Sequence, residues 1–115
     1  MSPSQKDLRL LYERSGNRCA FPDYLRVLDA PGSDTDAPVI LSDVAQIVAQ
    51  QPDGPRGHYP LPLEKRDDCD NLMLLCQEHH RLIDQQPHRF TVERLRQMKA
   101  DHERRIRQVT GCGNC

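Results

Sequence analysis

The feature that most restricts how this chain can fold is a cysteine followed three residues later by a histidine, in the run Cys76-Gln77-Glu78-His79-His80. At the start of a helix, Cys76 and His79 can both turn toward one metal ion, and Zn²⁺ prefers sulfur and nitrogen ligands in a tetrahedron. Two donors do not complete such a site, so the fold must bring up further ligands, and Cys19 is the natural third. His80 lies about 100° further around the helix and is expected to point away from that ion, free for other work.

The composition favours a single small domain that a metal ion supports. The chain has 115 residues, of which 37% are hydrophobic and none is tryptophan. This length suits one domain. A core with so few large apolar side chains often needs additional stabilisation, for example by a bound metal ion. The polar N-terminus argues against a signal peptide, and no apolar stretch approaches the length of a membrane span. We therefore expect a cytoplasmic protein without membrane contact, whose cysteines bind metal instead of forming disulfides.

Periodicity and chain breakers predict one α+β domain over 1–115, with a core over about 15–85 and a tail over 110–115. The predicted elements are a helix over 4–15, a hairpin or knuckle over 19–28, a central strand over 39–49, an excursion over 50–62, a short strand or turn over 71–75, a helix over about 77–84 and a last helix over about 91–109. Thr91 is the expected N-cap of the last helix. The buried stripe of that helix is expected to comprise Val92, Leu95, Met98, His102, Ile106 and Val109.

Several separated motifs occur in the order found in HNH endonucleases. They are Ser15-Gly16-Asn17-Arg18-Cys19-Ala20-Phe21-Pro22, Val44-Ala45-Gln46-Ile47-Val48-Ala49, Gly54-Pro55-Arg56-Gly57, Asp70-Asn71-Leu72-Met73-Leu74-Leu75-Cys76 and His79-His80-Arg81-Leu82-Ile83-Asp84. Across roughly residues 8–105 the chain resembles this family, in the branch that supplies nuclease domains to bacterial restriction and cyclic-oligonucleotide antiphage effectors. The resemblance implies a ββα-metal (His-Me finger) core with a zinc knuckle, flanked by helices, and metal-dependent hydrolysis of DNA.

The resemblance also implies roles for three positions. In the family, the first motif histidine activates water, the asparagine braces the loop, and the last histidine holds a catalytic divalent ion such as Mg²⁺, Mn²⁺ or Ni²⁺. The second and third positions are Asn71 and His80, but the first is Gln46, whose amide has no usable proton affinity near neutral pH. If base catalysis is lost, hydrolysis is expected to be slower by about 10²–10⁴-fold. His58 is an alternative base, and Asp43 an alternative oxygen ligand of the ion.

The structural zinc site implied by the resemblance is incomplete. Its ligands would be Cys19, Cys76 and His79, with a fourth at residue 24, where this chain has Tyr24. A phenol, which ionises near pH ~10, is a poor ligand for zinc. The fourth ligand could instead be Cys69, Cys112 or Cys115, or the site could stay incomplete or lack zinc.

Double-stranded DNA is the partner that the resemblance implies, with Arg56 and Arg81 as candidate phosphate contacts. A nuclease that makes double-strand breaks often acts as a pair of subunits, so a homodimer is considered, as is a sensor domain beyond residue 109 of a longer parent chain. Two alternatives to an attenuated endonuclease stay open. The substitutions at residues 24 and 46 also suit an inactive nucleic-acid-binding or interaction module on the same fold. The cysteines and histidines alone suit a purely structural zinc module.

Overall fold

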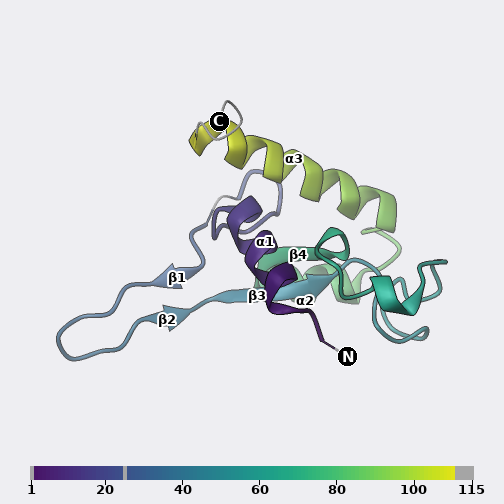
Figure 1. Cartoon of the computed structure of the whole chain (residues 1–115), viewed down its shortest axis with the longest axis horizontal. Helices are drawn as coiled ribbons and strands as arrows, with labels where there is room; N and C mark the ends of the chain where they lie inside the picture. Colours follow the sequence, from purple (N-terminus) through teal and green to yellow (C-terminus); the bar gives the residue numbers. More distant parts are fainter. Residues whose placement is uncertain (1, 25, 111–115) are drawn as a thin grey trace.

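The computed structural model describes residues 2–24 and 26–110, which form an α+β domain (Figure 1). Its α-helices are α1 (Gln5–Ser15), α2 (Gln77–Gln85) and α3 (Val92–Thr110). Its strands pair as two antiparallel sheets, β1 (Asp29–Ala30) with β2 (Val39–Ile40) and β3 (Ser42–Gln46) with β4 (Leu72–Cys76). Two 3-10 turns, η1 (Leu63–Lys65) and η2 (Cys69–Asn71), precede β4. The predicted α+β class is thus confirmed, and none of the described helices is long and apolar enough to cross a membrane.

The pair of strands β3 and β4 lies at the centre of the core. All of β4 is buried, which explains its continuous apolar run, whereas β3 fully buries only Ala45. The register pairs Ser42 with Cys76 and Gln46 with Leu72. Helix α2 begins directly after β4 and packs back against both strands. The first turns of α2 therefore lie beside β3.

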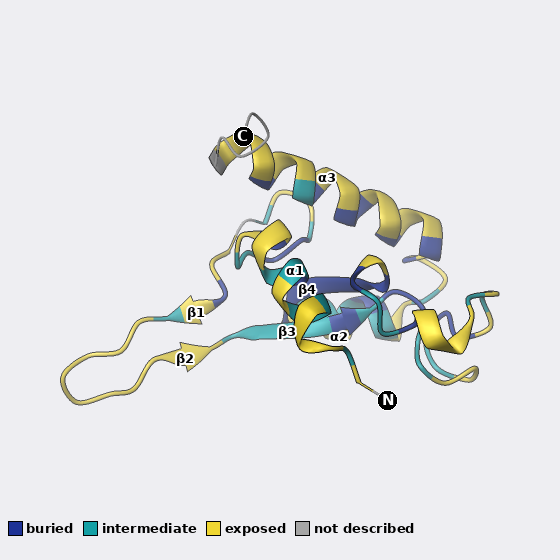
Figure 2. Cartoon of the chain, in the orientation of Figure 1, coloured by how far each residue is buried: buried dark blue, intermediate teal, exposed yellow. Residues whose placement is uncertain are grey.

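The single central strand predicted over 39–49 is wrong, because this segment forms two strands in different sheets. Leu41 separates them, and its backbone N–H donates to the carbonyl oxygen of Leu28. Val39 and Ile40 are 51% and 77% exposed, since β1 and β2 form an arm that extends away from the core (Figures 1 and 2). The β-branched residues correctly indicate extended backbone here, but they do not specify its pairing partner.

Side chains cap the N-termini of both α1 and α3. Ser4 Oγ accepts a hydrogen bond of 3.1 Å from the backbone N–H of Asp7. Thr91 Oγ1, the predicted cap, accepts one of 3.2 Å from the N–H of Arg94. Helix α1 ends at Gly16, whose φ of 60° is the left-handed conformation that glycine adopts readily. The two helix boundaries that depend on caps were therefore predictable from sequence.

The apolar stripe of α3 packs against α1 and contributes to the hydrophobic core. Its buried members are Val92, Leu95, Met98, His102 and Ile106, which confirms most of the prediction. A Cβ atom on Gly16 would lie 2.9 Å from Ile106 Cγ2, so the glycine permits a close approach between the helices. Val109 was predicted for the same stripe, but it is 74% exposed because it lies one turn beyond this contact.

His102, in that stripe, makes the stability of the fold depend on pH. Its Nε2 donates to the carbonyl oxygen of Ser15 at 2.9 Å, and burial lowers the pKa of the ring below its ordinary value. The contribution of the neutral ring to stability is therefore complete above pH ~6.5 and is lost as the pH falls below it. Between pH 8 and pH 5 we expect the wild type to lose more free energy of unfolding than His102→Gln, by at most about 1.4 kcal/mol per pH unit. The Gln amide can still donate to Ser15, and equal losses in urea titrations of the two proteins would contradict this account.

Two buried arginines, Arg56 and Arg66, hold the connection between β3 and β4. This connection comprises residues 47–71, is longer than the predicted 50–62, and is called the excursion from here on. Arg56 donates to the carbonyl oxygens of Ile47, Ile83 and Phe90 and to the carboxylate of Asp84. Arg66 donates to the carbonyl oxygens of Ala49, Gly57, Tyr59 and Leu61. Buried backbone carbonyls outside a helix or sheet need donors, and a guanidinium offers five N–H groups. These two side chains therefore anchor the excursion to the core despite its prolines, although most of its residues are exposed or half-buried.

Candidate functional site

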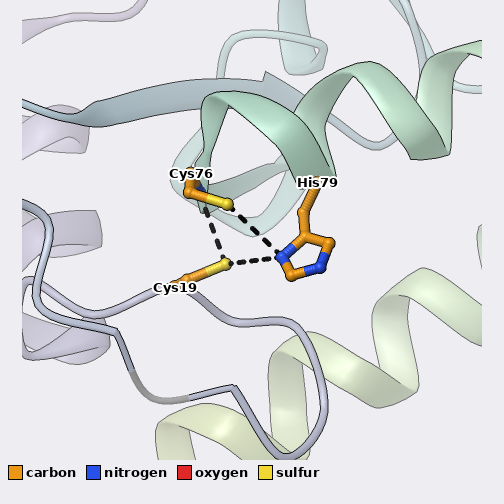
Figure 3. Close-up of side chains that lie close together, drawn as sticks. All are labelled: Cys19, Cys76 and His79. Carbon is orange, nitrogen blue, oxygen red and sulfur yellow. Dashed lines mark hydrogen bonds between the residues drawn. The ribbon is translucent and has the colours of Figure 1, made fainter.

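Three side chains from two distant segments form a cluster that could hold a metal ion: Cys19, Cys76 and His79. His79 Nδ1 lies 3.5 Å from Cys19 Sγ and 3.4 Å from Cys76 Sγ. The backbone N–H of Cys76 also donates to Cys19 Sγ at 3.3 Å. Figure 3 shows the three groups pointing toward one another from the loop after α1, the end of β4 and the first turn of α2. The predicted set of three ligands is thus brought together.

Local structure fixes the orientation of each group in the metal cluster. The segment after α1 turns back on itself, with Cys19 N–H donating to the carbonyl oxygen of Arg26. The ring of Phe21 stacks on the imidazole of His79 with centroids 3.9 Å apart, and the ring of Tyr24 meets it edge-on at 4.6 Å. These aromatic contacts restrict the imidazole so that its Nδ1 faces the two sulfur atoms.

Burial keeps Cys19 and His79 neutral when no cation is present. Desolvation raises the pKa of the Cys19 thiol to about 11 and lowers the pKa of His79 below its ordinary value. A bound metal ion reverses the balance for a thiol, because the ion stabilises the thiolate directly. A neutral imidazole is already the form that coordinates metal. The protonation states therefore suit an ion that displaces protons from cysteine only.

The fourth ligand is not found among the cysteines that the structure describes. Tyr24 reaches the cluster, but it presents its ring to His79 while its phenol oxygen accepts a hydrogen bond from Arg26. Cys69 is buried elsewhere, in η2, where Arg14 contacts its sulfur, so its proposed repair of the site is wrong. Cys112 and Cys115 lie outside the described residues. Tyr24 thus supports the site as an aromatic neighbour of a ligand.

A pocket of about 440 Å³ opens on the other side of α2. Its wall includes side chains of β3 and α2 together with parts of the excursion. The polar groups in this wall are Gln46, Gln50, Asp67, His80 and Asp84, with Ser2 at the rim. A concave site with several convergent polar groups is where binding or catalysis is expected. His80 and Gln46, singled out from the sequence, therefore lie in the wall of one pocket.

His80 points away from the metal-ligand cluster, as predicted, and its ring is held between two carboxylates. Its Nδ1 lies 3.0 Å from Asp43 Oδ2, and its Nε2 lies 3.1 Å from Asp84 Oδ2. The hydrogen bond with Asp84, opposed by desolvation and assisted by Asp43, raises the pKa of His80 to about 9. Burial alone would raise the pKa of Asp84, but hydrogen bonds from His80 and Arg56 outweigh it and lower that pKa. Near neutral pH this is a charged triad that attracts cations.

The side-chain amide of Gln46 is hydrogen-bonded to neighbouring groups of the protein. Its Nε2 lies within hydrogen-bond distance of Asp67 Oδ1 (2.9 Å), the Arg66 carbonyl oxygen (3.2 Å) and Gln50 Oε1 (3.3 Å). Its Oε1 accepts from the backbone N–H of Gln50 at 3.1 Å. Three acceptors compete for two N–H groups, so the amide has no free donor with which to orient a water molecule.

Asp67 is a functional candidate that the sequence did not reveal. Its Oδ1 accepts from Gln46, but its buried Oδ2 has no hydrogen-bond partner among the described residues. Leaving a buried acceptor unsatisfied costs about 1–3 kcal/mol, and more when the group is charged. Such an atom in a pocket wall is commonly completed by a ligand, water or ion. The sequence around Asp67 has no periodicity, and its only distinguishing feature is that Asp67 directly follows Arg66.

Asn71 ties the two ends of the excursion together. Its Oδ1 accepts from the backbone N–H of Val48, and its Nδ2 donates to the carbonyl oxygens of Val48 and Arg66 at 2.9 and 2.7 Å. The side chain is buried, at 4% exposure, and its three bonds run from the end of η2, just before β4, to backbone groups of Val48 and Arg66. This geometry braces the loop that carries Asp67.

Other predicted site residues lie elsewhere. Arg56, expected to contact phosphate, is 4% exposed with its guanidinium bound to protein oxygens, so that prediction is wrong. His58 is exposed and lines a different, smaller pocket beside His88, away from the wall that holds Gln46. Arg81 is exposed on α2 directly after His80 and stays a candidate.

The sequence was compared with families of known proteins and with curated proteins. No family pattern matches the chain. No curated protein matches it either. What the site can do is therefore argued from its own residues.

Proposed function

We propose that this chain is an HNH-type DNA endonuclease domain in which metal-dependent phosphodiester hydrolysis is attenuated by Gln46. The order of antiparallel strand, excursion, strand and helix in β3, β4 and α2 agrees with a ββα-metal core. The observation that carries the proposal is that Gln46, His80 and Asp84 line one pocket. Gln46 is at the base position of the motif, His80 is at the cation position, and Asp84 adds a carboxylate beside His80.

His80 and Asp84 fit a divalent cation. Ligands about 2.1 Å from an octahedral ion lie about 3 Å apart when they are adjacent. His80 Nε2 and Asp84 Oδ2 are 3.1 Å apart, so one ion could replace the proton that they share. When bound, Mg²⁺, Mn²⁺ or Ni²⁺ would polarise the scissile phosphate and stabilise the leaving oxygen. Because the pKa of His80 is raised to about 9, cation binding releases a proton from the ring near neutral pH.

The second metal in this proposal is zinc, held by Cys19, Cys76 and His79. Ligands about 2.3 and 2.1 Å from a tetrahedral ion lie about 3.6 Å apart. The observed separations between sulfur and nitrogen, 3.5 and 3.4 Å, are close to that value. This ion would fix the start of α2 relative to the loop after α1, and so would position His80, which follows His79 directly.

The proposed DNA partner would meet Arg81, whose exposed guanidinium follows His80 on α2. Arginine is well suited to phosphate because its planar group can form two parallel hydrogen bonds with it. Asn71 supports the proposal as well, since its three hydrogen bonds give it the bracing role that the family implies.

A plasmid-nicking assay tests the proposal. Wild-type protein is expected to nick supercoiled DNA slowly with Mg²⁺, Mn²⁺ or Ni²⁺, and His80→Ala is expected to lose at least 100-fold, because the cation loses its nitrogen ligand. His88→Ala, which removes an exposed histidine outside the pocket, is the matched control and should cut like the wild type. Cutting by His80→Ala at the wild-type rate would contradict the proposal.

One observation favours a second function, a nucleic-acid-binding module without catalysis. The Gln46 amide is fully engaged within the protein, so the base position itself holds no group that can activate water. In that case DNA would be retained at low salt, released as salt rises, and never cut. Absence of retention at low salt would remove this alternative.

A further inference from the structure

We propose that Asp67 is the general base of this pocket, held in place by Gln46; this inference rests on the proposed endonuclease function. Asp67 lines the same pocket as His80 and Asp84, and its segment is fixed by the hydrogen bonds of Asn71. It is also the residue of that pocket with a buried oxygen that has no partner among the described residues. The pocket therefore holds a carboxylate with unused lone pairs next to the position where the family has its histidine.

The two oxygens of Asp67 have different surroundings. Oδ1 accepts the Gln46 amide at 2.9 Å, which sets the rotation of the carboxylate. Oδ2 keeps its lone pairs free and is shielded from bulk solvent. A group that accepts a proton during hydrolysis needs a free lone pair, a fixed position and access from the bound substrate's side. The first two conditions are met by Oδ2. For the third, a bound substrate or its water would have to reach this buried oxygen from the pocket that Asp67 lines.

Gln46 then acts as a positioning residue. Its Nε2 bridges Asp67 Oδ1 and the carbonyl oxygen of Arg66, and its Oε1 is bound to the backbone of Gln50. An amide fixed at both ends cannot accept a proton, but it can hold a neighbouring carboxylate. In this proposal the base is Asp67 in the excursion, instead of the histidine that the family has at the position of Gln46 in β3.

The step is balanced as a simple hydrolysis. The water oxygen forms a bond to phosphorus while one water proton passes to Asp67 Oδ2. The bond from phosphorus to the leaving sugar oxygen breaks, and that oxygen takes a proton from solvent. Asp67 returns its proton to solvent before the next turnover. No oxidant, reductant or further reactant is needed.

The test compares Asp67→Asn with wild type and with Asp34→Asn, which makes the same chemical change on the exposed arm outside the pocket. Asparagine keeps an Oδ1 that can accept the Gln46 amide and replaces Oδ2 by an NH₂ group that cannot take a proton. Asp67→Asn is expected to lower the rate of plasmid nicking at least 100-fold. Its Tm should stay close to that of the wild type, because one unpartnered buried polar atom is replaced by another and only the charge is lost. Retention of DNA on a filter at low salt should be unchanged, and Asp34→Asn should match the wild type in all three measurements.

A second variant separates loss of the base from loss of the pocket. Gln46→His added to Asp67→Asn should restore nicking, since an imidazole at residue 46 supplies a base without Asp67. The restored activity should fall at lower pH, because an imidazole at residue 46 is then protonated and cannot accept a proton from water.

The outcomes distinguish this inference from the function on which it rests. If the wild type nicks DNA and Asp67→Asn nicks it equally well, Asp67 is not the base and the endonuclease proposal stands. If the wild type nicks with none of the three metals while Gln46→His does, Asp67 is overturned as the base and the pocket is otherwise sound. If neither nicks, both the inference and the endonuclease function fall.

Discussion

Removal of the zinc ion that we propose for Cys19, Cys76 and His79 is expected to unfold the domain. These ligands tie the loop after α1 to the junction of β4 and α2, and the rings of Phe21 and Tyr24 pack around the imidazole. Structural zinc contributes about 10–16 kcal/mol of apparent binding free energy in zinc-finger peptides, which exceeds the whole stability of many small domains. Stoichiometric zinc by elemental analysis, with loss of the helical circular dichroism signal on chelation or in Cys76→Ser, would be the expected result.

Cys69→Ser is the matched control for the zinc variants. Cys69 is also buried, but it lies in η2 with Arg14 against its sulfur and outside the metal cluster. It should keep its zinc and lose only a modest part of its stability. If the chelated wild type unfolds within a few degrees of the untreated protein, the hydrophobic core alone holds the fold and the cluster is dispensable.

Replacement of Gln46 by histidine is expected to raise the rate of DNA nicking about 10²-fold or more, within the range of about 10²–10⁴ that a positioned base contributes. The Arg66 carbonyl oxygen and Asp67 Oδ1, which now accept the Gln46 amide, can accept one ring N–H of a histidine. The other ring nitrogen would then be free to accept a proton from water. An imidazole is a stronger base than a carboxylate, so the gain should remain even where Asp67 already serves.

Gln50→His provides the control for this gain of activity. Gln50 lines the same pocket, so the change places an imidazole nearby but not at residue 46. Only Gln46→His should accelerate nicking in the presence of the divalent metals. An equal acceleration by Gln50→His would mean that any added imidazole suffices and that residue 46 has no special position. No acceleration by either variant would mean that the cation position on His80 is itself defective.

The local signals in the sequence predicted most of the framework and the metal cluster. Helix caps such as Thr91 act over a few residues, and the spacing of Cys76 and His79 acts within one helical turn, so both can be identified without knowing the fold. Cys19 could be added because it is the one cysteine that precedes β3 in the sequence. The cluster brings these three together as expected.

Features that depend on the whole fold were predicted wrongly or missed. Arg56 stands in a turn of glycine and proline that suits a surface contact, yet its partners Ile83 and Phe90 come from a distant part of the chain. No pattern near residue 56 encodes that burial. Asp67 likewise becomes a candidate only through its hydrogen bond with Gln46, which lies in β3, 21 positions earlier in the sequence. Long-range hydrogen bonds to backbone atoms leave no periodic trace in a sequence.

The brace formed by Asn71 has a consequence for how chains of this kind can diversify. Because Asn71 joins Val48 to the far end of the excursion, the excursion is closed at its base by bonds that do not depend on what lies between. Doubling the length of a flexible loop closed in this way costs only about 0.6 kcal/mol. Insertions in its exposed stretch 62–65, which does not line this pocket, can therefore accumulate without opening the brace. The excursion is therefore the part of the molecule whose length can change while the brace at its base stays fixed.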